Sequence, residues 1–346
     1  MRATAAAAVR RLRSPPGAIA LSALLLLAAL AVPRCAAPPR VEAPSPGAEL
    51  VRRGDEIVIC GRLFHTGAPV VLWTDPDGYD AYRTDRRFAP PEEAPWAPGR
   101  GPATPNRYDA RSVPGGADDL DALRRHVDQF VIHYDAAGTS RQCFKILHDL
   151  RGLSIHFMID IDGTIYQTLD VKDRAWHATI ANGRSVGVEL AHIGAYAPES
   201  AETLRQWYAE DGAGTRITIP VWQGDGGIRT PGFVGRPASS EPVSGVIQGQ
   251  TLVQYDFTPE QYDSLAKLTA ALCAVLPQIR CDYPRDEHGR PLARAMTPDE
   301  FAAYRGLLGH SHIQQNKVDP GPAFDWDRLR QSAQLRMRRE SAVSPS

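Results

Sequence analysis

The chain has 346 residues, of which 43% are hydrophobic and 23% are charged, so it is long enough to bury the core of one or two domains. Its 39 Lys and Arg residues nearly balance its 40 Asp and Glu residues. Bulk electrostatic attraction to nucleic acid or acidic lipid needs a basic excess, so both partners are excluded at this level. A charged partner must be bound locally.

The first 36 residues have the pattern of a secretory signal. Four arginines precede an apolar run from Ala18 to Val32, which a proline and small residues follow. A permanent membrane span needs roughly 20 apolar residues, and this run is shorter. We therefore expect residues 1–36 to direct export to the periplasm or the cell envelope. Cys35 suggests lipid attachment, but Arg34 stands where a small residue is usual, which disfavours a lipoprotein.

The cysteines bear on the same expectation. If the chain is exported, Cys60, Cys143, Cys273 and Cys281 enter an oxidising compartment. Cys273 and Cys281 are the favoured disulfide pair by proximity, although spacing alone cannot fix connectivity. The sequence has no Cys-x-x-Cys pattern, which argues against a structural zinc knuckle.

A Pro/Gly-rich N-terminal extension, residues 37–118, follows the signal. Its proline-rich stretches are residues 37–47 and 90–116. Between them, EIVIC (56–60) and PVVLW (69–73) predict short strands, which are too few for an independent core. We expect the extension to pack on the main domain.

The main domain, residues 119–338, begins with a strand, a helix and a hairpin. FVIHY (130–134) is a continuous apolar run that predicts a buried strand. Thr139 and Gln142 then form a capping-box pattern before an apolar face at helical spacing. The members of that face are Cys143, Ile146, Leu147 and Leu150, and Gly152 ends the helix. In SIHFMIDIDGTIYQTL, an Asp-Gly pair between two apolar segments predicts a β-hairpin.

The rest of the main domain predicts a mixed sheet flanked by helices. SVGVELAHI (185–193) is a further buried strand, and residues 194–254 are rich in Gly and Pro, which indicates a long surface insertion. Thr-Pro caps at 258–259 and 297–298 begin two helices. A final strand, GLLGHSHI, and a terminal helix follow, and residues 339–346 form a disordered tail. The fold class is α/β.

Two histidines, a lysine and an aspartate carry the chemistry. A catalytic zinc site typically has three protein ligands and an open position. His133 lies at the end of the strand FVIH, and His310 lies near the end of LLGH. Asp319 follows Lys317 by two residues, so an extended backbone points both side chains the same way. A cation beside a metal ligand is useful where charge develops on a substrate oxygen. The residues alone support a zinc hydrolase hypothesis and no more.

Four segments resemble the zinc-dependent N-acetylmuramoyl-L-alanine amidase and peptidoglycan recognition protein superfamily, and they occur in the order typical of that family. They are VIHYDA, SIHFMIDIDGTIYQ, AWHATIANGRSVGVEL and GHSHIQQNKVDPGPAFDW. The resemblance implies a mixed sheet with zinc in a groove over it. It leaves the N-terminal extension and much of the insertion unexplained.

The resemblance also implies roles for single residues. His133, His310 and Asp319 would bind Zn²⁺, Glu189 would be the general base, and Lys317 would stabilise the oxyanion. One branch of the family uses a tyrosine in place of the glutamate, and that tyrosine lies just before the His-Phe pair of the hairpin strand. The residue at the tyrosine's position here is Ile155, whereas Glu189 is present.

The other histidines leave alternatives open. Trp176 and His177, in AWH, match a motif near the groove and are expected to contact substrate. His312 is expected to share the strand face of His310 and is a rival metal ligand. His156 matches a structural position, and His192 is expected to be exposed.

The implied activity is hydrolysis of the amide between N-acetylmuramic acid and L-alanine. The partners would be peptidoglycan or muropeptides, with no nucleic acid and no stable protein partner. Two alternatives remain at this level: a peptidoglycan-binding protein without activity, and a zinc peptidase of different bond specificity. Relatives that only bind usually lack a zinc ligand, whereas here all three are present.

Overall fold

The computed structural model describes residue 47 and residues 51–93 and 107–343, with side chains described to residue 338. The expected signal, residues 1–36, lies outside the described residues. The chain divides into two compact units, Met1–Leu50 and Val51–Ser346, and every described helix and strand lies in the second. Within the described residues, no helix is both long and apolar enough to cross a membrane.

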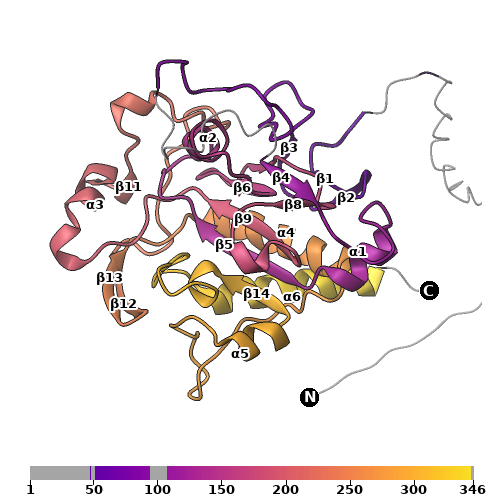
Figure 1. Cartoon of the computed structure of the whole chain (residues 1–346). Helices are drawn as coiled ribbons and strands as arrows, with labels where there is room; N and C mark the ends of the chain where they lie inside the picture. Colours follow the sequence, from indigo (N-terminus) through magenta and orange to yellow (C-terminus); the bar gives the residue numbers. More distant parts are fainter. Residues whose placement is uncertain (1–46, 48–50, 94–106, 344–346) are drawn as a thin grey trace, which may run out of the picture. The chain divides into compact units, whose positions relative to one another are not determined.

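A six-stranded mixed sheet forms the centre of this unit (Figure 1). Its strand order is β14-β5-β9-β6-β7-β3. The first four strands run parallel, β7 is antiparallel to β6, and β3 is parallel to β7. The predicted fold class, a mixed sheet flanked by helices, is therefore confirmed. The strand bounds are β14 Gly306–Gly309, β5 Gln129–Tyr134, β9 Ser185–Leu190, β6 Phe157–Ile159, β7 Ile165–Gln167 and β3 Val70–Leu72.

One face of the sheet is covered by helices. Side chains alternate along a strand, so Phe130 and Ile132 of β5 point to the same face as Val186 and Val188 of β9, and they share one hydrophobic cluster with the helices. The covering helices are α1 Leu120–His126, α4 Pro259–Val275 and α6 Trp326–Val343. The capping box predicted at Thr258 begins α4. Because α6 continues to Val343, residues 339–343, which were expected in the tail, are helical.

The opposite face carries two smaller clusters with a gap between them. Over β6, β7 and β3, one cluster joins Met158 and Tyr166 to Phe144 of α2 (Ser140–Phe144). Over β14 and β5, the other joins Val131 and Leu308 to residues near α5 (Pro298–Ala303). The part of the face between them carries polar side chains at the ends of β5 and β9. This gap positions the site described below.

The helix after β5 departs from the sequence prediction. Thr139 accepts the predicted N-cap bond from the Gln142 backbone N–H, but after α2 the chain widens into a π-helical segment, Lys145–Arg151, which Gly152 ends in a left-handed conformation. A wider turn rotates the later side chains. Ile146 and Leu147, predicted to be buried, are therefore only half-buried, whereas His148 and Asp149 are buried.

Residues 51–93 pack on the main domain, as their short strands suggested. β3 extends the central sheet at the β7 edge. β1 Glu56–Ile59 pairs with β2 Arg62–His65, and Ile57 and Ile59 lie in the main hydrophobic cluster. Further along the chain, β4 Tyr108–Ala110 pairs with β8 Asp173–Ala175.

The insertion, residues 194–254, folds into small elements with a cluster of their own around Trp207 and Leu204. In Figure 1, α3 and the hairpin strands gather beside the central sheet. The insertion is tied to the loop after β5, because Gln223 accepts from the Thr139 hydroxyl at 3.0 Å and donates to the Ala137 carbonyl at 2.9 Å. The bounds are α3 Glu202–Trp207, β10 Tyr208–Asp211, β11 Gly214–Ile217, β12 Val243–Ile247 and β13 Gln250–Gln254.

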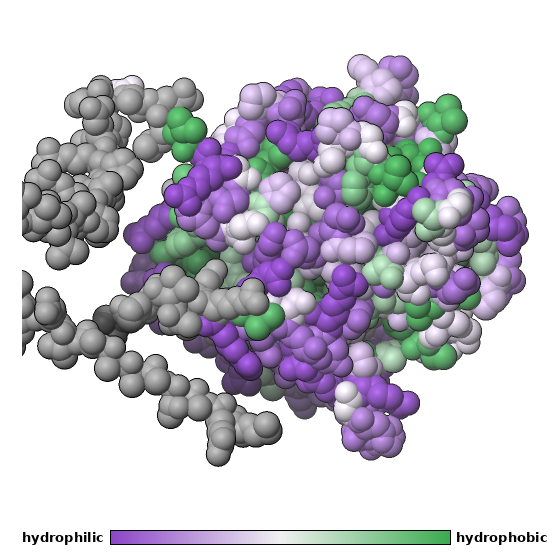
Figure 2. Space-filling model, turned by 180° about the vertical axis from the view of Figure 1, so that it is seen from behind, coloured by the Kyte–Doolittle hydropathy of each residue, from purple (hydrophilic) through white to green (hydrophobic). Residues whose placement is uncertain are grey.

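The surface view shows how polar and apolar residues are distributed over one face. Figure 2 shows a face on which hydrophilic residues predominate and hydrophobic residues lie in small separate groups. Among the described residues, Val221 and Trp222 of the insertion are large hydrophobic side chains exposed side by side along the chain, at 96% and 69%. Single exposed apolar residues are normal on soluble surfaces.

Candidate functional site

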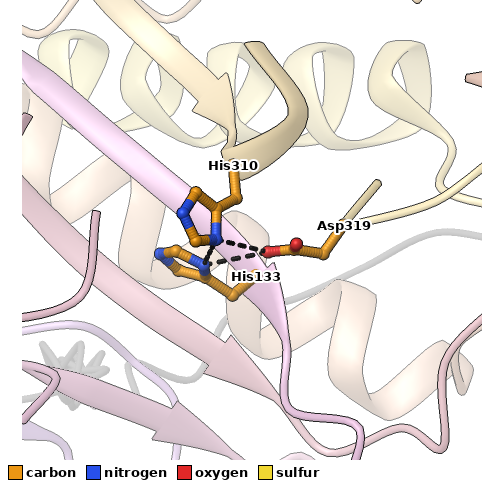
Figure 3. A group of neighbouring side chains, drawn as sticks. All are labelled: His133, His310 and Asp319. Atoms are coloured by element: carbon orange, nitrogen blue, oxygen red, sulfur yellow. Dashed lines mark hydrogen bonds and ion pairs between the residues drawn. The ribbon is translucent and has the colours of Figure 1, made fainter. Parts of the chain in front are cut away.

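Three side chains from distant parts of the sequence meet in the gap over the sheet. His133 comes from the end of β5, His310 from the short 3-10 turn after β14, and Asp319 from the loop before α6 (Figure 3). His133 Nδ1 lies 3.1 Å from His310 Nδ1 and 2.9 Å from Asp319 Oδ2. The third distance, from His310 Nδ1 to Asp319 Oδ2, is 3.2 Å. All three residues are buried.

The contacts of the outer nitrogens, the Nε2 atoms of His133 and His310, bear on whether the two Nδ1 atoms have lone pairs available for a metal. His310 Nε2 lies 2.6 Å from Gln314 Oε1, an acceptor, so it carries the hydrogen. His133 Nε2 lies 3.0 Å from His177 Nδ1. Burial lowers the pKa of His133 to about 4, so the ring is neutral and has one hydrogen. If each ring carries its hydrogen on the outer nitrogen, both Nδ1 atoms present lone pairs to the Asp319 carboxylate.

A metal ion fits this arrangement. Three electron-rich atoms at these distances repel one another unless a cation lies among them. Ligand atoms 2.0–2.1 Å from a tetrahedral zinc stand roughly 3.3 Å apart, close to the observed triangle. Two imidazoles and a carboxylate are also a ligand set of catalytic zinc sites, which keep one position open. The predicted ligands are thus brought together in a metal-capable group.

The chain holds Asp319 through its backbone neighbours. Ser311 N–H donates to the Asp319 carbonyl at 3.0 Å. Gln254 of β13 donates to the Pro320 carbonyl at 3.0 Å and accepts from the Ala323 N–H at 3.0 Å. Gly321 has a φ of 91°, and a Cβ there would collide with Gln254. The Pro-Gly-Pro turn is therefore packed in place and fixes the position of the carboxylate.

Glu189 lies beside His133. The two residues are paired in register on neighbouring parallel strands, and both line a cavity of about 300 Å³. Its Oε2 is buried without a hydrogen-bond partner among the described residues. Burial, together with the charges of Asp319 and Asp135, raises the pKa of Glu189 well above its usual range, and Lys317 opposes this rise. A cation held by Asp319 would offset part of that repulsion.

Lys317 lines the same cavity and a second one of about 540 Å³ next to it. Both cavities also include Arg151, for which the described residues provide no hydrogen bond or ion pair. Arg151 was not predicted as a site residue, because it lies beyond the last predicted apolar position of its helix. Arg151 is the last residue of the π-helical segment described above.

The predicted substrate-contact residues have definite partners. Trp176 lines both cavities, and its indole N–H donates to Asp109 at 2.8 Å. His177 lines both cavities as well, but its Nδ1 faces His133 rather than open space. Burial and the neighbouring His133 and His156 lower the pKa of His177, which keeps it neutral.

Two expectations about histidines are wrong. His312 does not share a strand face with His310, because the strand ends at Gly309 and both lie in a 3-10 turn. Its Nε2 lies 2.7 Å from the Leu292 carbonyl and its Nδ1 accepts from Gly309 N–H, so neither nitrogen is free for a metal. His192 is buried rather than exposed, and its Nε2 lies 2.9 Å from the Tyr255 carbonyl.

His156 has the structural role expected of it. It is fully buried, it accepts from the Gly187 N–H at 3.1 Å, and its Nε2 lies 3.0 Å from the Asp173 carbonyl. Gln314 and Asp135 were missed from sequence. Gln314 stands four residues after His310, and Asp135 stands two residues after His133, just beyond the end of β5, so spacing from a ligand is the signal that could have found them.

The fold and the site define a class: an α/β protein with a metal-capable His, His, Asp group in a groove over a mixed sheet. Residues 123–215 match the family model described as N-acetylmuramoyl-L-alanine amidase, which is the family that the motifs resemble. The matched segment contains His133, His177 and Glu189 but ends before His310 and Asp319. No curated protein matches the chain.

Three solved structures are similar to part of the chain. AmpD, solved as its selenomethionine derivative, is 19% identical, with 65% of this chain and 89% of that chain covered and a TM-score of 0.31. AmiD from E. coli, solved with anhydro-N-acetylmuramic acid-L-Ala-D-γ-Glu-L-Lys, is 18% identical, with 60% and 57% covered and a TM-score of 0.34. The endolysin amidase LysCS from Clostridium intestinale URNW is 14% identical, with 62% and 86% covered and a TM-score of 0.29.

Proposed function

We propose that the protein is an exported, zinc-dependent amidase that cleaves the bond between N-acetylmuramic acid and L-alanine in peptidoglycan or its fragments. The observation that carries the proposal is the triangle of His133, His310 and Asp319 donor atoms beside Glu189, whose Oε2 has no hydrogen-bond partner among the described residues. The family match supports peptidoglycan amidase activity as the general class. Export rests on the arginine-led apolar run of residues 1–36.

Each residue of the site has a separate role in the proposed reaction. A zinc ion held by His133, His310 and Asp319 would polarise the scissile carbonyl and lower the pKa of a bound water. Glu189 accepts a proton as the water oxygen attacks the carbonyl carbon. Lys317 stabilises the negative charge that develops on the carbonyl oxygen. As the C–N bond breaks, Glu189 delivers the proton to the nitrogen of the leaving L-alanine.

The groove also suits an acidic substrate. Arg151, Arg174 and Lys317 line the second cavity. A stem peptide that contains a γ-linked glutamate leaves an α-carboxylate free, as in the ligand named for AmiD. Cationic side chains in a partly enclosed groove attract such carboxylates.

Mass analysis of a muropeptide digest by the purified protein tests the proposal. We expect free sugar and a peptide that begins with L-alanine, and we expect both to disappear when zinc is removed by a chelator. Cleavage between two amino acids would instead establish a zinc peptidase. Binding of the muropeptide without cleavage, by a protein that contains zinc, would establish the binding-protein alternative.

A further inference from the structure

His133 is engaged at both ring nitrogens. Its Nδ1 faces His310 and Asp319, and its Nε2 lies 3.0 Å from His177 Nδ1. A neutral imidazole has one N–H and one lone pair. If Nδ1 is to bind a metal, the hydrogen must sit on Nε2, where it donates to His177. The partner of Nε2 therefore determines which nitrogen of His133 has a lone pair available for the metal.

His177 is itself held so that it can accept this hydrogen. Its Nε2 lies 3.3 Å from Ser185 Oγ, the only other side-chain partner found for its ring within the described residues. When Nε2–H donates to Ser185, Nδ1 keeps its lone pair toward His133. The rings of His133 and His177 meet edge to face, with centroids 5.2 Å apart at 83°. The backbone is fixed as well, because Asn182 Oδ1 accepts from the N–H groups of His177 and Ala178.

The neighbouring strand has a glycine where the ring needs space. A Cβ on Gly187 would lie 2.6 Å from both Nδ1 and Cε1 of His177 and 2.5 Å from Ile155. These separations are well below ordinary contact. Gly187 is in the middle of β9, where glycine weakens a strand and often marks a place of close approach. The approach it permits here is that of the His177 imidazole.

From this geometry we infer that His177 is a positioning residue, which fixes the ring orientation and the tautomer of His133 so that Nδ1 faces the metal. This inference rests on the metal site of the proposed function but not on the bond that is cleaved. It replaces the substrate contact expected from sequence with an action through His133. Ligand histidines usually donate their second N–H to a carboxylate, a carbonyl or water. A neutral imidazole in that place orients the ligand without adding negative charge.

A pair of amide variants tests the inference. In His177→Asn the side-chain oxygen can take roughly the place of Nδ1, whereas in His177→Gln the amide extends to the place of Nε2. Zinc affinity is measured on the metal-free, full-length proteins by competition with a chromophoric chelator. We expect the Gln variant and His177→Ala to lose about 10- to 100-fold in zinc affinity, the usual effect of removing such a partner. The Asn variant should stay within a few-fold of wild type.

Two further measurements separate positioning from general damage. The Co²⁺-loaded proteins should show a changed visible absorption spectrum in the Gln and Ala variants and a wild-type spectrum in the Asn variant. Trp176→Phe is the matched control, because Trp176 lines the same cavities and does not bond to His133, so its zinc affinity should not change.

The outcomes are distinct. Equal zinc affinity in the Asn and Gln variants would overturn the inference, because the position of the acceptor would then not matter. Wild-type zinc affinity in His177→Ala with a raised KM would overturn it in favour of substrate contact. A wild-type protein that binds no zinc would overturn the metal site itself, whereas zinc binding without amide cleavage would leave the inference standing and remove only the proposed reaction.

Discussion

Glu189 and Asp319 are buried carboxylates of one cavity with different surroundings. Asp319 Oδ2 contacts both candidate histidine ligands, whereas Glu189 Oε2 has no hydrogen-bond partner among the described residues. We expect Asp319→Ala to lose zinc and turnover together. Glu189→Gln is nearly isosteric and spares the ligands, so zinc should remain while turnover falls by about 10²-fold or more. Metal analysis and muropeptide turnover on the same preparations measure both, and near wild-type turnover in Glu189→Gln would show that the base is another residue.

The role of Lys317 can be distinguished from that of the zinc ligands by the same two measurements, zinc content and turnover. Its side chain lines the cavity beside His310 and Asp319 without belonging to the metal-capable group. Lys317→Met should keep zinc and lower kcat by about 10²- to 10³-fold, as for the loss of one oxyanion donor. Arg151→Met is the comparison, since it removes a charge from the same cavity. We expect that variant to raise KM more than it lowers kcat, and the opposite pattern would exchange the two roles.

At the residue scale, sequence predicted side chains whose neighbours are set by strand ends and failed where partners are distant. His133 and Glu189 each lie one residue before the end of a strand, and the pairing of these two strands places them side by side. His192 and His312 bond to the carbonyls of Tyr255 and Leu292, far along the chain. The residues next to either histidine in the sequence do not indicate such a distant partner. Their burial therefore could not be inferred from spacing.

The π-helical segment shows the same limit at the scale of elements. A helical period predicted Ile146 and Leu147 on the buried face, but the wider turns from Lys145 onward rotate the side chains. The rotation buries Asp149 instead, where its carboxylate accepts from the backbone N–H groups of Arg87, Phe88 and Ala89. The tertiary contact with the extension thus accompanies a local geometry that periodicity does not encode.

These contacts make Asp149 a source of pH-dependent stability. Burial alone would raise its pKa, but the bonds from His148 and the three backbone N–H groups outweigh it, so the pKa is lowered. A lowered folded pKa contributes stability above the unfolded pKa, about 3.9, and that stability is lost as the pH falls through the folded value. Asp149→Asn should be less stable at pH 7 by about 1–3 kcal/mol. Denaturant unfolding should show the difference shrinking below pH ~4, and a constant difference across that range would contradict the assignment.

The two cysteines near the end of α4 also belong to this scale. Cys273 and Cys281, the favoured disulfide pair, are free thiols in the structure, and the Cys281 thiol is hydrogen-bonded to Cys273. In an oxidising compartment, a low-molecular-weight disulfide can accept the two electrons and two hydrogens that the pair gives up. Closing so short a loop should stabilise the fold by about 2–3 kcal/mol. Thiol alkylation after oxidation should spare this pair while Cys60 and Cys143 still react on unfolding, and alkylation of Cys273 and Cys281 would contradict it.

At the scale of the whole molecule, the sequence indicated the mixed sheet but not its full width. The hairpin and the alternation of strands with helices were visible, because each depends on local signals. The pairing of β3 with β7 joins residues far apart in the sequence, so nothing in PVVLW identifies its neighbour. The sequence therefore predicted that the extension packs on the main domain, but not that it supplies the edge strand of the sheet.

This contribution can be tested by truncation. A chain that begins at Val51 keeps every described helix and strand, whereas a chain that begins at Asp119 loses β1 to β4. The second truncation uncovers the β7 edge and removes buried side chains such as Ile57, Ile59 and Val71, each worth about 1.5–3 kcal/mol. It also leaves the buried Gln167 amide without its two bonds to the Val58 backbone. Because domains are stable by only about 5–15 kcal/mol, we expect the chain from Val51 to unfold cooperatively and bind zinc like the full chain, and the chain from Asp119 to be unfolded or aggregated. Thermal unfolding followed by circular dichroism measures both, and cooperative unfolding with zinc binding in the shorter chain would show that the extension is dispensable for the fold.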